Sequence, residues 1–277
     1  MDAARAFSTM IKEVTAPCRN RQRMVQTKLE LILSPAEFAS LAQRDLSHAV
    51  CVVFDILRAT STMITALSNG AEAIIPVADI PEALALRRKN PNVLLAGERD
   101  GLRIRGELSG GVEFDLGNSP REFTAEKVQG RTLVMTTTNG TRALRACAQA
   151  RTVLIGSFLN LRATTNWLRE RNPPHLILVC SGTCEEPALE DILAAGSLCE
   201  KIWSQYAGGH VSDSAEVARR IYPLMQFNLV DAMKSSRNGR RLLNHPDLRD
   251  DVYLCVQRET AAFVAAMLPG GAVRRLT

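Results

Sequence analysis

A chain of 277 residues with 46% hydrophobic and 23% charged residues has the composition of a globular protein, which excludes disordered, collagen-like and coiled-coil proteins. It is long enough to bury a large core without disulfides, and its apolar runs, such as 176–180 and 192–195, are too short to cross a bilayer. We therefore expect no membrane partner, and seven cysteines without close pairing predict a reduced, cytoplasmic protein.

The net charge of +5 is concentrated in residues 1–28, where lysines and arginines outnumber the acids. Such a basic segment can be a nucleic-acid arm or a transit-like segment. We favour a flexible N-terminal extension, with Met24 as an alternative start, because terminal residues are commonly poorly ordered. The segment lacks the series of interleaved aromatic residues on which single-stranded bases stack, so we expect no nucleic-acid partner.

After the basic segment, short apolar runs alternate with longer amphipathic stretches, which is the pattern of strands and helices in an α/β protein. A strand at 29–33 is followed by a helix that begins with the capping box of Ser34 and Glu37. Residues 49–54 are apolar without a break, which predicts a strand buried on both faces, with Asp55 at its end.

The alternation continues with a helix at 60–68, which Asn69-Gly70 ends. In chain order we then predict a strand at 73–77, a helix at 81–88, a strand at 93–96, a loop at 100–120, a strand at 133–135, a helix ending at 150, strands at 153–155 and 177–180, and a helix at 185–203. A loop of such length is typical of a functional segment. From about residue 205 the pattern is helical, interrupted by a basic turn at 236–241. The sequence predicts one α/β domain over 29–277, with helices on both faces of the sheet.

Several predicted strands end in small hydroxyl residues, glycine or asparagine directly before a helix begins. Backbone amides at helix N-termini carry partial positive charge and bind phosphate or carboxylate groups. In an open parallel sheet such loops meet outside the carboxyl ends of the strands. We therefore expect the following residues to converge: Asp55, Glu98, Thr137, Asn139, Ser181 and Thr183. Ordinary helix capping explains each segment alone, and only their recurrence favours a binding site.

Acidic residues lie at strand ends, in the long loop or near a helix start: Asp55, Glu98, Asp115, Glu190 and Asp191. One or two carboxylates together with a substrate phosphate and water are the ligands that Mg²⁺ prefers, so these acids predict a magnesium site. Asp55 directly follows a buried strand and precedes Arg58, which favours a functional site over a simple turn. Glu190 and Asp191 are equally compatible with a solvated helix start.

The sequence motifs of several other enzyme classes are absent. The chain has no Gly-x-x-x-x-Gly-Lys-Ser/Thr phosphate loop, no Gly-x-Gly-x-x-Gly after a strand and no Gly-x-Ser-x-Gly elbow. Asp55 is not followed two residues later by the second acid of a haloacid-dehalogenase-type phosphatase. The four histidines lack metal-ligand spacing, and Cys180 lies in an apolar run without a base nearby.

Several longer segments follow one another in a characteristic order: Val52-Val53-Phe54-Asp55-Ile56-Leu57-Arg58-Ala59-Thr60-Ser61-Thr62, Gly97-Glu98-Arg99, Phe114-Asp115-Leu116-Gly117-Asn118-Ser119-Pro120, Thr136-Thr137-Thr138-Asn139-Gly140-Thr141-Arg142, Ala188-Leu189-Glu190-Asp191, Gly239-Arg240-Arg241-Leu242 and Asp251-Val252-Tyr253-Leu254-Cys255. Together they resemble the 2-phosphosulfolactate phosphatase family from about residue 29 to 254. Residues before 29 fall outside the resemblance, and the chain carries extra residues at 107–113 relative to the family pattern.

The resemblance implies a three-layer α/β/α fold with a mixed, largely parallel sheet, and a Mg²⁺-dependent hydrolase. Such an enzyme converts 2-phospho-3-sulfolactate into 3-sulfolactate and inorganic phosphate, a step of coenzyme M synthesis in methanogens. A small anionic ligand with phosphate, carboxylate and sulfonate groups needs several anion-binding loops and arginines. Two alternatives stay open. One is a phosphatase for another 2-phosphorylated small hydroxy acid, which the extra residues favour, and the other is a non-catalytic anion-binding protein on the same fold.

The resemblance also implies roles for individual residues. We assign catalysis to Asp55, Arg58 and Glu98, and Mg²⁺ binding to Asp55, Glu98 and Asp191. Substrate binding is assigned to Arg99, Asn118, Ser119, Thr137, Thr138, Asn139, Gly140, Thr141, Arg142, Ser181, Gly182, Thr183 and Arg240. Either Asp55 attacks phosphorus, or Mg²⁺ held by the acids orients a water in line, with arginine and amide donors neutralising the phosphate oxygens. The missing second acid favours the water route, while the sequence leaves both routes, and a homodimer, open.

Overall fold

The computed structural model describes residues 26–276 of the chain. The predicted basic extension lies largely outside the described residues, although its last residue, Lys28, already begins the first strand. The described residues form one sheet of 11 strands. The strands are β1 (Lys28–Ile32), β2 (Val50–Phe54), β3 (Ala73–Pro76), β4 (Leu94–Arg99), β5 (Leu102–Arg103), β6 (Thr132–Thr136), β7 (Thr152–Gly156), β8 (His175–Cys180), β9 (His210–Val211), β10 (Ala265–Met267) and β11 (Val273–Arg275).

The sheet consists of two groups of parallel strands joined by a hairpin. Its order is β5-β4-β6-β3-β11-β10-β7-β2-β8-β1-β9, in which β4, β6 and β3 form one parallel group and β7, β2, β8, β1 and β9 the other. The hairpin of β10 and β11 pairs antiparallel with β7 on one side and with β3 on the other. Three successive antiparallel pairings make the two groups run in opposite directions. The predicted mixed, largely parallel sheet is confirmed.

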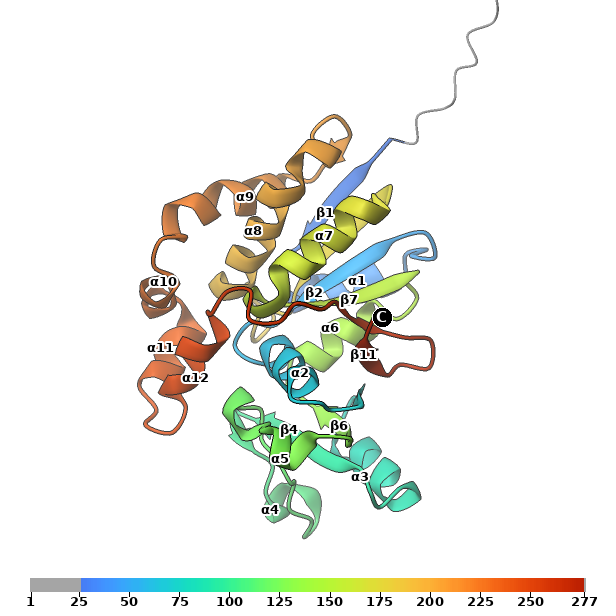
Figure 1. Ribbon diagram of the computed structural model, residues 1–277, viewed down its shortest axis with the longest axis vertical. Coiled ribbons are helices and arrows are strands. Elements are labelled where there is room, and N and C mark those ends of the chain that lie inside the picture. Colours follow the sequence, from blue (N-terminus) through green and yellow to red (C-terminus); the bar gives the residue numbers. More distant parts are fainter. Residues whose placement is uncertain (1–25, 277) are drawn as a thin grey trace, which may run out of the picture.

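Helices cover both faces of the sheet, and the last four of them gather beside one end of it (Figure 1). They are α1 (Phe38–Ala42), α2 (Ala59–Ser68), α3 (Ile80–Lys89), α4 (Gly106–Ser109), α5 (Ala125–Val128), α6 (Gly140–Ala146), α7 (Leu161–Arg171), α8 (Leu189–Tyr206), α9 (Asp213–Met225), α10 (Leu229–Ser235), α11 (Arg237–Leu243) and α12 (Arg249–Cys255), with short 3-10 helices η1 (Pro35–Glu37), η2 (Pro120–Glu122) and η3 (Phe158–Asn160). Within residues 26–276, none of the helices combines the length and apolar character needed to span a membrane.

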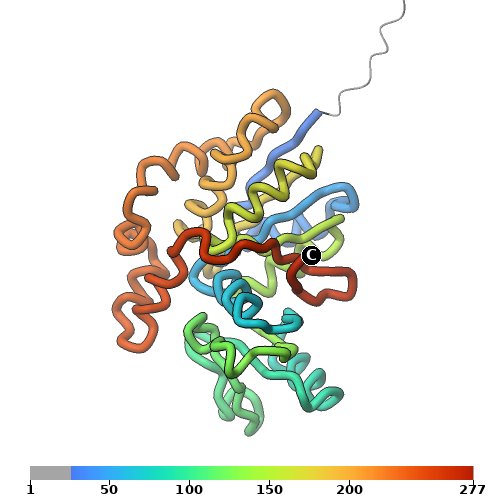
Figure 2. The backbone as a smooth tube through the Cα atoms, viewed as in Figure 1, coloured from blue at the N-terminus to red at the C-terminus, as the bar shows by residue number. Residues whose placement is uncertain are grey.

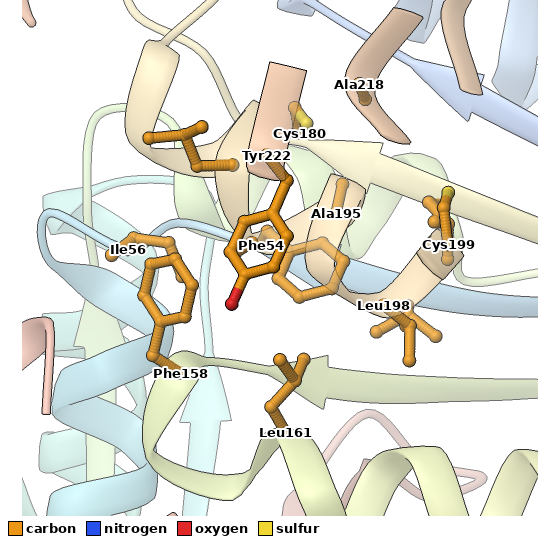
Figure 3. Packing of buried hydrophobic residues seen from close by; sticks show 14 of the residues in the cluster. Phe54, Ile56, Phe158, Leu161, Cys180, Ala195, Leu198, Cys199, Ala218 and Tyr222 are labelled. Carbon is orange, nitrogen blue, oxygen red and sulfur yellow. The ribbon is translucent and has the colours of Figure 1, made fainter. Parts of the chain in front are cut away.

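Strand β2 lies in the centre of the core and shows why the protein has three layers. All five of its residues are buried, and alternate side chains face opposite sides of the sheet. Val52 and Phe54 pack with residues of α7, α8 and α9, whereas Cys51 and Val53 pack with residues of α1, α2 and α6. Figure 3 shows part of the first cluster, around Phe54. The sheet is thus buried between two helical layers, and the α/β/α expectation is confirmed.

Local sequence signals determine where several of these elements begin and end. Ser34 and Glu37 form the predicted capping box, with the Glu37 carboxylate accepting from the Ser34 backbone amide at 3.3 Å. Helix α2 ends before Gly70, whose φ of +88° lies in the left-handed region that glycine adopts without strain. These signals are short-range, and the sequence predicts them correctly.

Two predictions about the later part of the chain are wrong. The helix expected from residue 185 begins at Leu189, because Thr183 and Glu186 exchange backbone hydrogen bonds of 2.8 and 3.1 Å in a tight turn. The expected basic turn at 236–241 forms part of helix α11, since the Ser236 side chain accepts from the Gly239 amide at its N-terminus. After residue 205 the chain forms helices α9 to α12, and the backbone then crosses the molecule from α12 to the β10–β11 hairpin (Figure 2).

Candidate active site

A small polar cavity of about 80 Å³ lies where the loops after four strands of both parallel groups meet helix α11. Its lining includes these predicted site residues: Asp55, Arg58, Glu98, Asn118, Thr138, Asn139, Gly182 and Thr183. It also includes residues that the sequence did not indicate: Leu57, Asp100, Gly101, Cys184, Asn238 and Arg241. Because the two groups of strands run in opposite directions, the loops do not meet along one shared carboxyl edge. They meet around α2, whose Thr62 hydroxyl donates to the Asn118 carbonyl at 2.9 Å.

Asp55 occupies the loop between β2 and α2 and keeps one carboxylate oxygen available. Its Oδ1 accepts from the Ala59 amide at 3.1 Å, while Oδ2 accepts no hydrogen bond among the described residues. Burial raises the pKa of Asp55 to about 7, and the negative charges of Glu98 and Glu190 act in the same direction. A carboxylate in such surroundings gains from a nearby cation, because the cation offsets both the desolvation and the repulsion.

Glu98 and Asp191 hold the loops of the cavity in place. Glu98 Oε1 accepts from the Thr138 amide and hydroxyl at 2.7 and 2.9 Å, and its Oε2 accepts from the Gly101 amide at 2.8 Å. Asp191, which is buried, accepts from the Ile56 amide at 2.8 Å and from the Gly182 amide at 3.1 Å. Both carboxylates thus join loops that are distant in the sequence. Glu98 lines the cavity, whereas Asp191 does not.

Two buried oxygens near these acids have no hydrogen-bond partner among the described residues. Glu190 is 1% exposed, and its Oε1 accepts from Asn238 Nδ2 at 2.6 Å while its Oε2 is unpaired. Asn118 is 5% exposed and lines the cavity with its Oδ1 unpaired. An unpaired buried oxygen is costly, which favours a ligand or cation that pairs with it.

These oxygens fit Mg²⁺ better than a softer metal. Within residues 26–276, no three His, Cys, Asp or Glu side chains gather into a metal-binding group. Mg²⁺ does not need such a group, because it takes one or two carboxylates and completes its shell with water and substrate phosphate. The available donors are the free Oδ2 of Asp55 and the unpaired Oδ1 of Asn118, both in the cavity lining.

Arg58 is held by a buried ion pair that was not expected. Its Nη1 donates to Asp251 Oδ2 at 2.6 Å, and its Nη2 donates to the Gly101 carbonyl at 2.5 Å. Arg58 is 3% exposed and Asp251 is fully buried. The other oxygen of Asp251 accepts from the Ser119 hydroxyl at 2.6 Å and from Arg121 Nε at 2.8 Å. Ser119, an expected substrate-binding residue, therefore lies behind Arg58 and outside the cavity lining.

The segment from Thr137 to Thr141 packs against Asp55. The Thr141 amide donates to the Thr137 hydroxyl at 3.2 Å, so the Thr137 side chain pairs with an amide in the first turn of helix α6. A Cβ built on Gly140 would lie 2.7 Å from Asp55 Oδ2 and 2.6 Å from the Ala59 side chain. The space beside Gly140 is thus filled by α2 and Asp55. Thr138 and Asn139 are the members of this segment that line the cavity.

Several expected substrate-binding residues have other partners. Ser181 is buried, and its amide donates to the Phe54 carbonyl at 2.8 Å. Three arginines that were expected to bind substrate do not line the cavity: Arg99 donates to the Glu98 carbonyl at 2.6 Å, Arg142 to Glu185 at 2.8 Å and Arg240 to the Ser235 carbonyl at 2.7 Å. Arg241, the neighbour of Arg240, lines it instead. The extra residues 107–113 do not contribute to the lining either.

An α/β/α fold whose strand-end loops enclose a small cavity, with acids and arginines in its walls, defines an enzyme that acts on a small anionic molecule. The sequence model of the family described as 2-phosphosulpholactate phosphatase matches residues 37–268. The chain belongs to this family, and a 2-phosphosulfolactate phosphatase is by its reaction a phosphoric monoester hydrolase.

Several relatives match this chain over most of their own length. A probable 2-phosphosulfolactate phosphatase of Caldicellulosiruptor saccharolyticus is 36% identical over 232 residues, covering 82% of this chain and 93% of the relative. Another, from Caldanaerobacter subterraneus subsp. tengcongensis, is 38% identical over 221 residues, covering 79% and 88%. A third, from Thermotoga maritima, is 36% identical over 219 residues, covering 79% and 89%. The family match over residues 37–268 includes every residue that lines the cavity.

Proposed function

We propose that this protein is a Mg²⁺-dependent phosphatase that hydrolyses 2-phospho-3-sulfolactate to 3-sulfolactate and inorganic phosphate in the cytoplasm. The observation that carries the proposal is Asp55, whose Oδ2 accepts no hydrogen bond among the described residues and which lines a cavity together with two further acids, Glu98 and Asp100, and with Arg58. The family names supply the substrate, and the small size of the cavity suits a three-carbon acid.

For the metal, we propose that Asp55 and Asn118 supply the protein oxygens, with Glu98 and Asp191 holding the loops that carry the site. Of the three Mg²⁺ ligands expected from the sequence, only Asp55 is kept, because both oxygens of Glu98 and of Asp191 already accept hydrogen bonds from backbone amides. When bound, Mg²⁺ would offset charge on the phosphate oxygens.

The remaining steps fall to side chains of the cavity. Arg58, fixed by Asp251, places a guanidinium beside the phosphate and neutralises its oxygens. Thr138 and Asn139 contribute polar groups from the loop after β6. Asp55 Oδ2 is free for either of two routes, attack on phosphorus or orientation of a water. We favour the water route, because no second acid follows Asp55 to protonate a leaving group from that loop.

A phosphate-release assay on purified protein tests the proposal. The substrates are 2-phospho-3-sulfolactate, 2-phospholactate and 2-phosphoglycerate, each with Mg²⁺ and with excess EDTA, and Asp55→Asn is the control for contaminating phosphatases. We expect Mg²⁺-dependent release that is fastest from the sulfonated substrate. Faster release from another compound would instead support a phosphatase for a different 2-phosphorylated acid. Release from none of them, together with binding of these anions, would support an anion-binding protein.

A further inference from the structure

The cavity contains two arginines whose charges are compensated to different extents. Arg58 forms a buried ion pair with Asp251 at 2.6 Å, which offsets its charge within the protein. Arg241 lines the same cavity from helix α11, is exposed, and has no carboxylate or carbonyl partner among the described residues. A guanidinium without a partner, directed at a binding cavity, has all of its donors available for a ligand.

The two guanidiniums approach the same point of the chain. A Cβ built on Gly101 would lie 3.3 Å from Arg241 Nη2 and 3.9 Å from Arg58 Nη2. Two like charges this close repel each other, and an anion beside them removes the repulsion. Because Gly101 has a φ of +81° and no side chain, both arginines can approach its backbone.

Helix α11 holds Arg241 in a fixed place. Gly239 packs so tightly that a Cβ there would lie 2.1 Å from the Met233 carbonyl oxygen. Asn238, one residue earlier, donates to Thr183 Oγ1 at 2.8 Å and to Glu190 Oε1 at 2.6 Å. The helix is thereby tied to the loop after β8 and to the start of α8. Arg241 is therefore presented to the cavity by a rigid element.

Arg58 and Arg241 reach the cavity from different elements of the fold. Arg58 follows Asp55 by three residues and lines the cavity with it, so Arg58 belongs to the end of the cavity where phosphate and Mg²⁺ are proposed to bind. Arg241 comes from α11, and its guanidinium reaches the same side of Gly101 as that of Arg58 but without a partner among the described residues. In 2-phospho-3-sulfolactate the sulfonate is carried by the carbon next to the phosphorylated one, and it is charged at every physiological pH.

We propose that Arg241 binds the sulfonate group of the substrate and so determines specificity for it, an inference that rests on the proposed function. The sequence had indicated its neighbour Arg240, which donates to the Ser235 carbonyl outside the cavity. Loss of one charge-assisted contact should raise the KM for the sulfonated substrate about 10- to 100-fold. A substrate without the sulfonate never makes this contact and should be unaffected.

The test compares variants R241Q, R241K and R240Q with K234Q, an exposed lysine on α10 that pairs with Asp231 away from the cavity. Each is assayed on 2-phospho-3-sulfolactate and on 2-phospholactate with Mg²⁺. We expect R241Q to raise KM for the sulfonated substrate alone, R241K to recover part of the loss, and K234Q to behave as the wild type. Equal losses on both substrates, no loss in R241Q, or the KM effect in R240Q instead would each overturn the proposal.

Calorimetric binding of 3-sulfolactate separates this inference from the proposed function. R241Q should weaken binding of 3-sulfolactate about 10-fold or more, while K234Q should not. If the wild type binds 3-sulfolactate but releases no phosphate from either substrate, the proposed function fails. The Arg241 assignment is then decided by whether R241Q binds 3-sulfolactate more weakly than the wild type does. If the wild type does not bind 3-sulfolactate, the Arg241 assignment is overturned directly.

Discussion

Replacing Gly140 by alanine adds a single methyl group at the most crowded point of the candidate site. The new Cβ would lie 2.6 Å from the Ala59 Cβ and 2.7 Å from Asp55 Oδ2, whereas carbon atoms normally approach to about 3.5 Å. Ala59 is fully buried at the start of α2, so α2 or α6 must move by roughly 1 Å to relieve the overlap. Overpacking of this kind costs about 1–3 kcal/mol, which corresponds to a loss of roughly 2–12 °C in Tm for a domain of this size.

The same displacement moves Asp55 away from the reacting groups. A shift of about 1 Å in a catalytic group can cost about 100-fold in rate, so we expect Gly140→Ala to lower kcat by that order, with a smaller change in KM. The assay is Mg²⁺-dependent phosphate release with Tm measured in parallel. Gly208→Ala is the matched control, because a Cβ there meets nothing within 4 Å. If Gly140→Ala keeps the wild-type kcat and Tm, the contact with Asp55 is not important. If it raises KM at an intact kcat, Gly140 instead lines an anion-binding loop.

Three further predictions concern the acids. Asp55→Asn should lower kcat at least about 100-fold while keeping Tm at pH 8, because the charge it removes is itself unfavourable there; wild-type kcat would refute its role. Asp251→Asn leaves the Arg58 charge buried without its partner and should lower the free energy of unfolding by about 3–5 kcal/mol in urea titrations; a loss below about 1 kcal/mol would contradict this. Because the pKa of Asp55 is raised to about 7, its protonated form stabilises the fold at low pH, and this contribution is lost as the pH rises towards 7. Mg²⁺ binds the charged form, so Mg²⁺ should increase Tm more at about pH 8 than at about pH 5. Equal increases at the two pH values would exclude Asp55 as a ligand.

The sequence predicted those parts of the fold that depend on neighbouring residues. Strand β2 is an unbroken apolar run, and α2 ends at a glycine, so both are visible in a short window. Helix α11 was mistaken for a turn because Asn238-Gly239 is a common turn pair. Its glycine is instead required by packing against the Met233 carbonyl, which no local pattern reveals. The strands β10 and β11 have only three residues each and are specified by partners far away in the chain.

The residues of the candidate site also divide into those that a short stretch of sequence indicates and those that only the folded chain brings together. Asp55 and Asn139 follow strands and Glu98 lies near the end of β4, and all three were expected at the site because strand ends can be located from apolar runs. Arg241 and Asn238 come from a later helix, and nothing in the basic segment 236–241 distinguishes Arg241 from Arg240 before the helix is oriented. Asp251 follows a charged pair of residues that suggests a solvated surface, yet it is fully buried against Arg58.

The hairpin of β10 and β11 bears on how the protein is made. A ribosome releases the chain from its N-terminal end, so β3 and β7 both emerge long before residues 265–275 that join them. Until then each has an unpaired edge, and the loops that carry Asp55 and Glu98 belong to two separate groups of strands. A nascent chain interrupted after α12 would contain every residue of the cavity, yet it would lack the two strands that hold the halves of the catalytic site together.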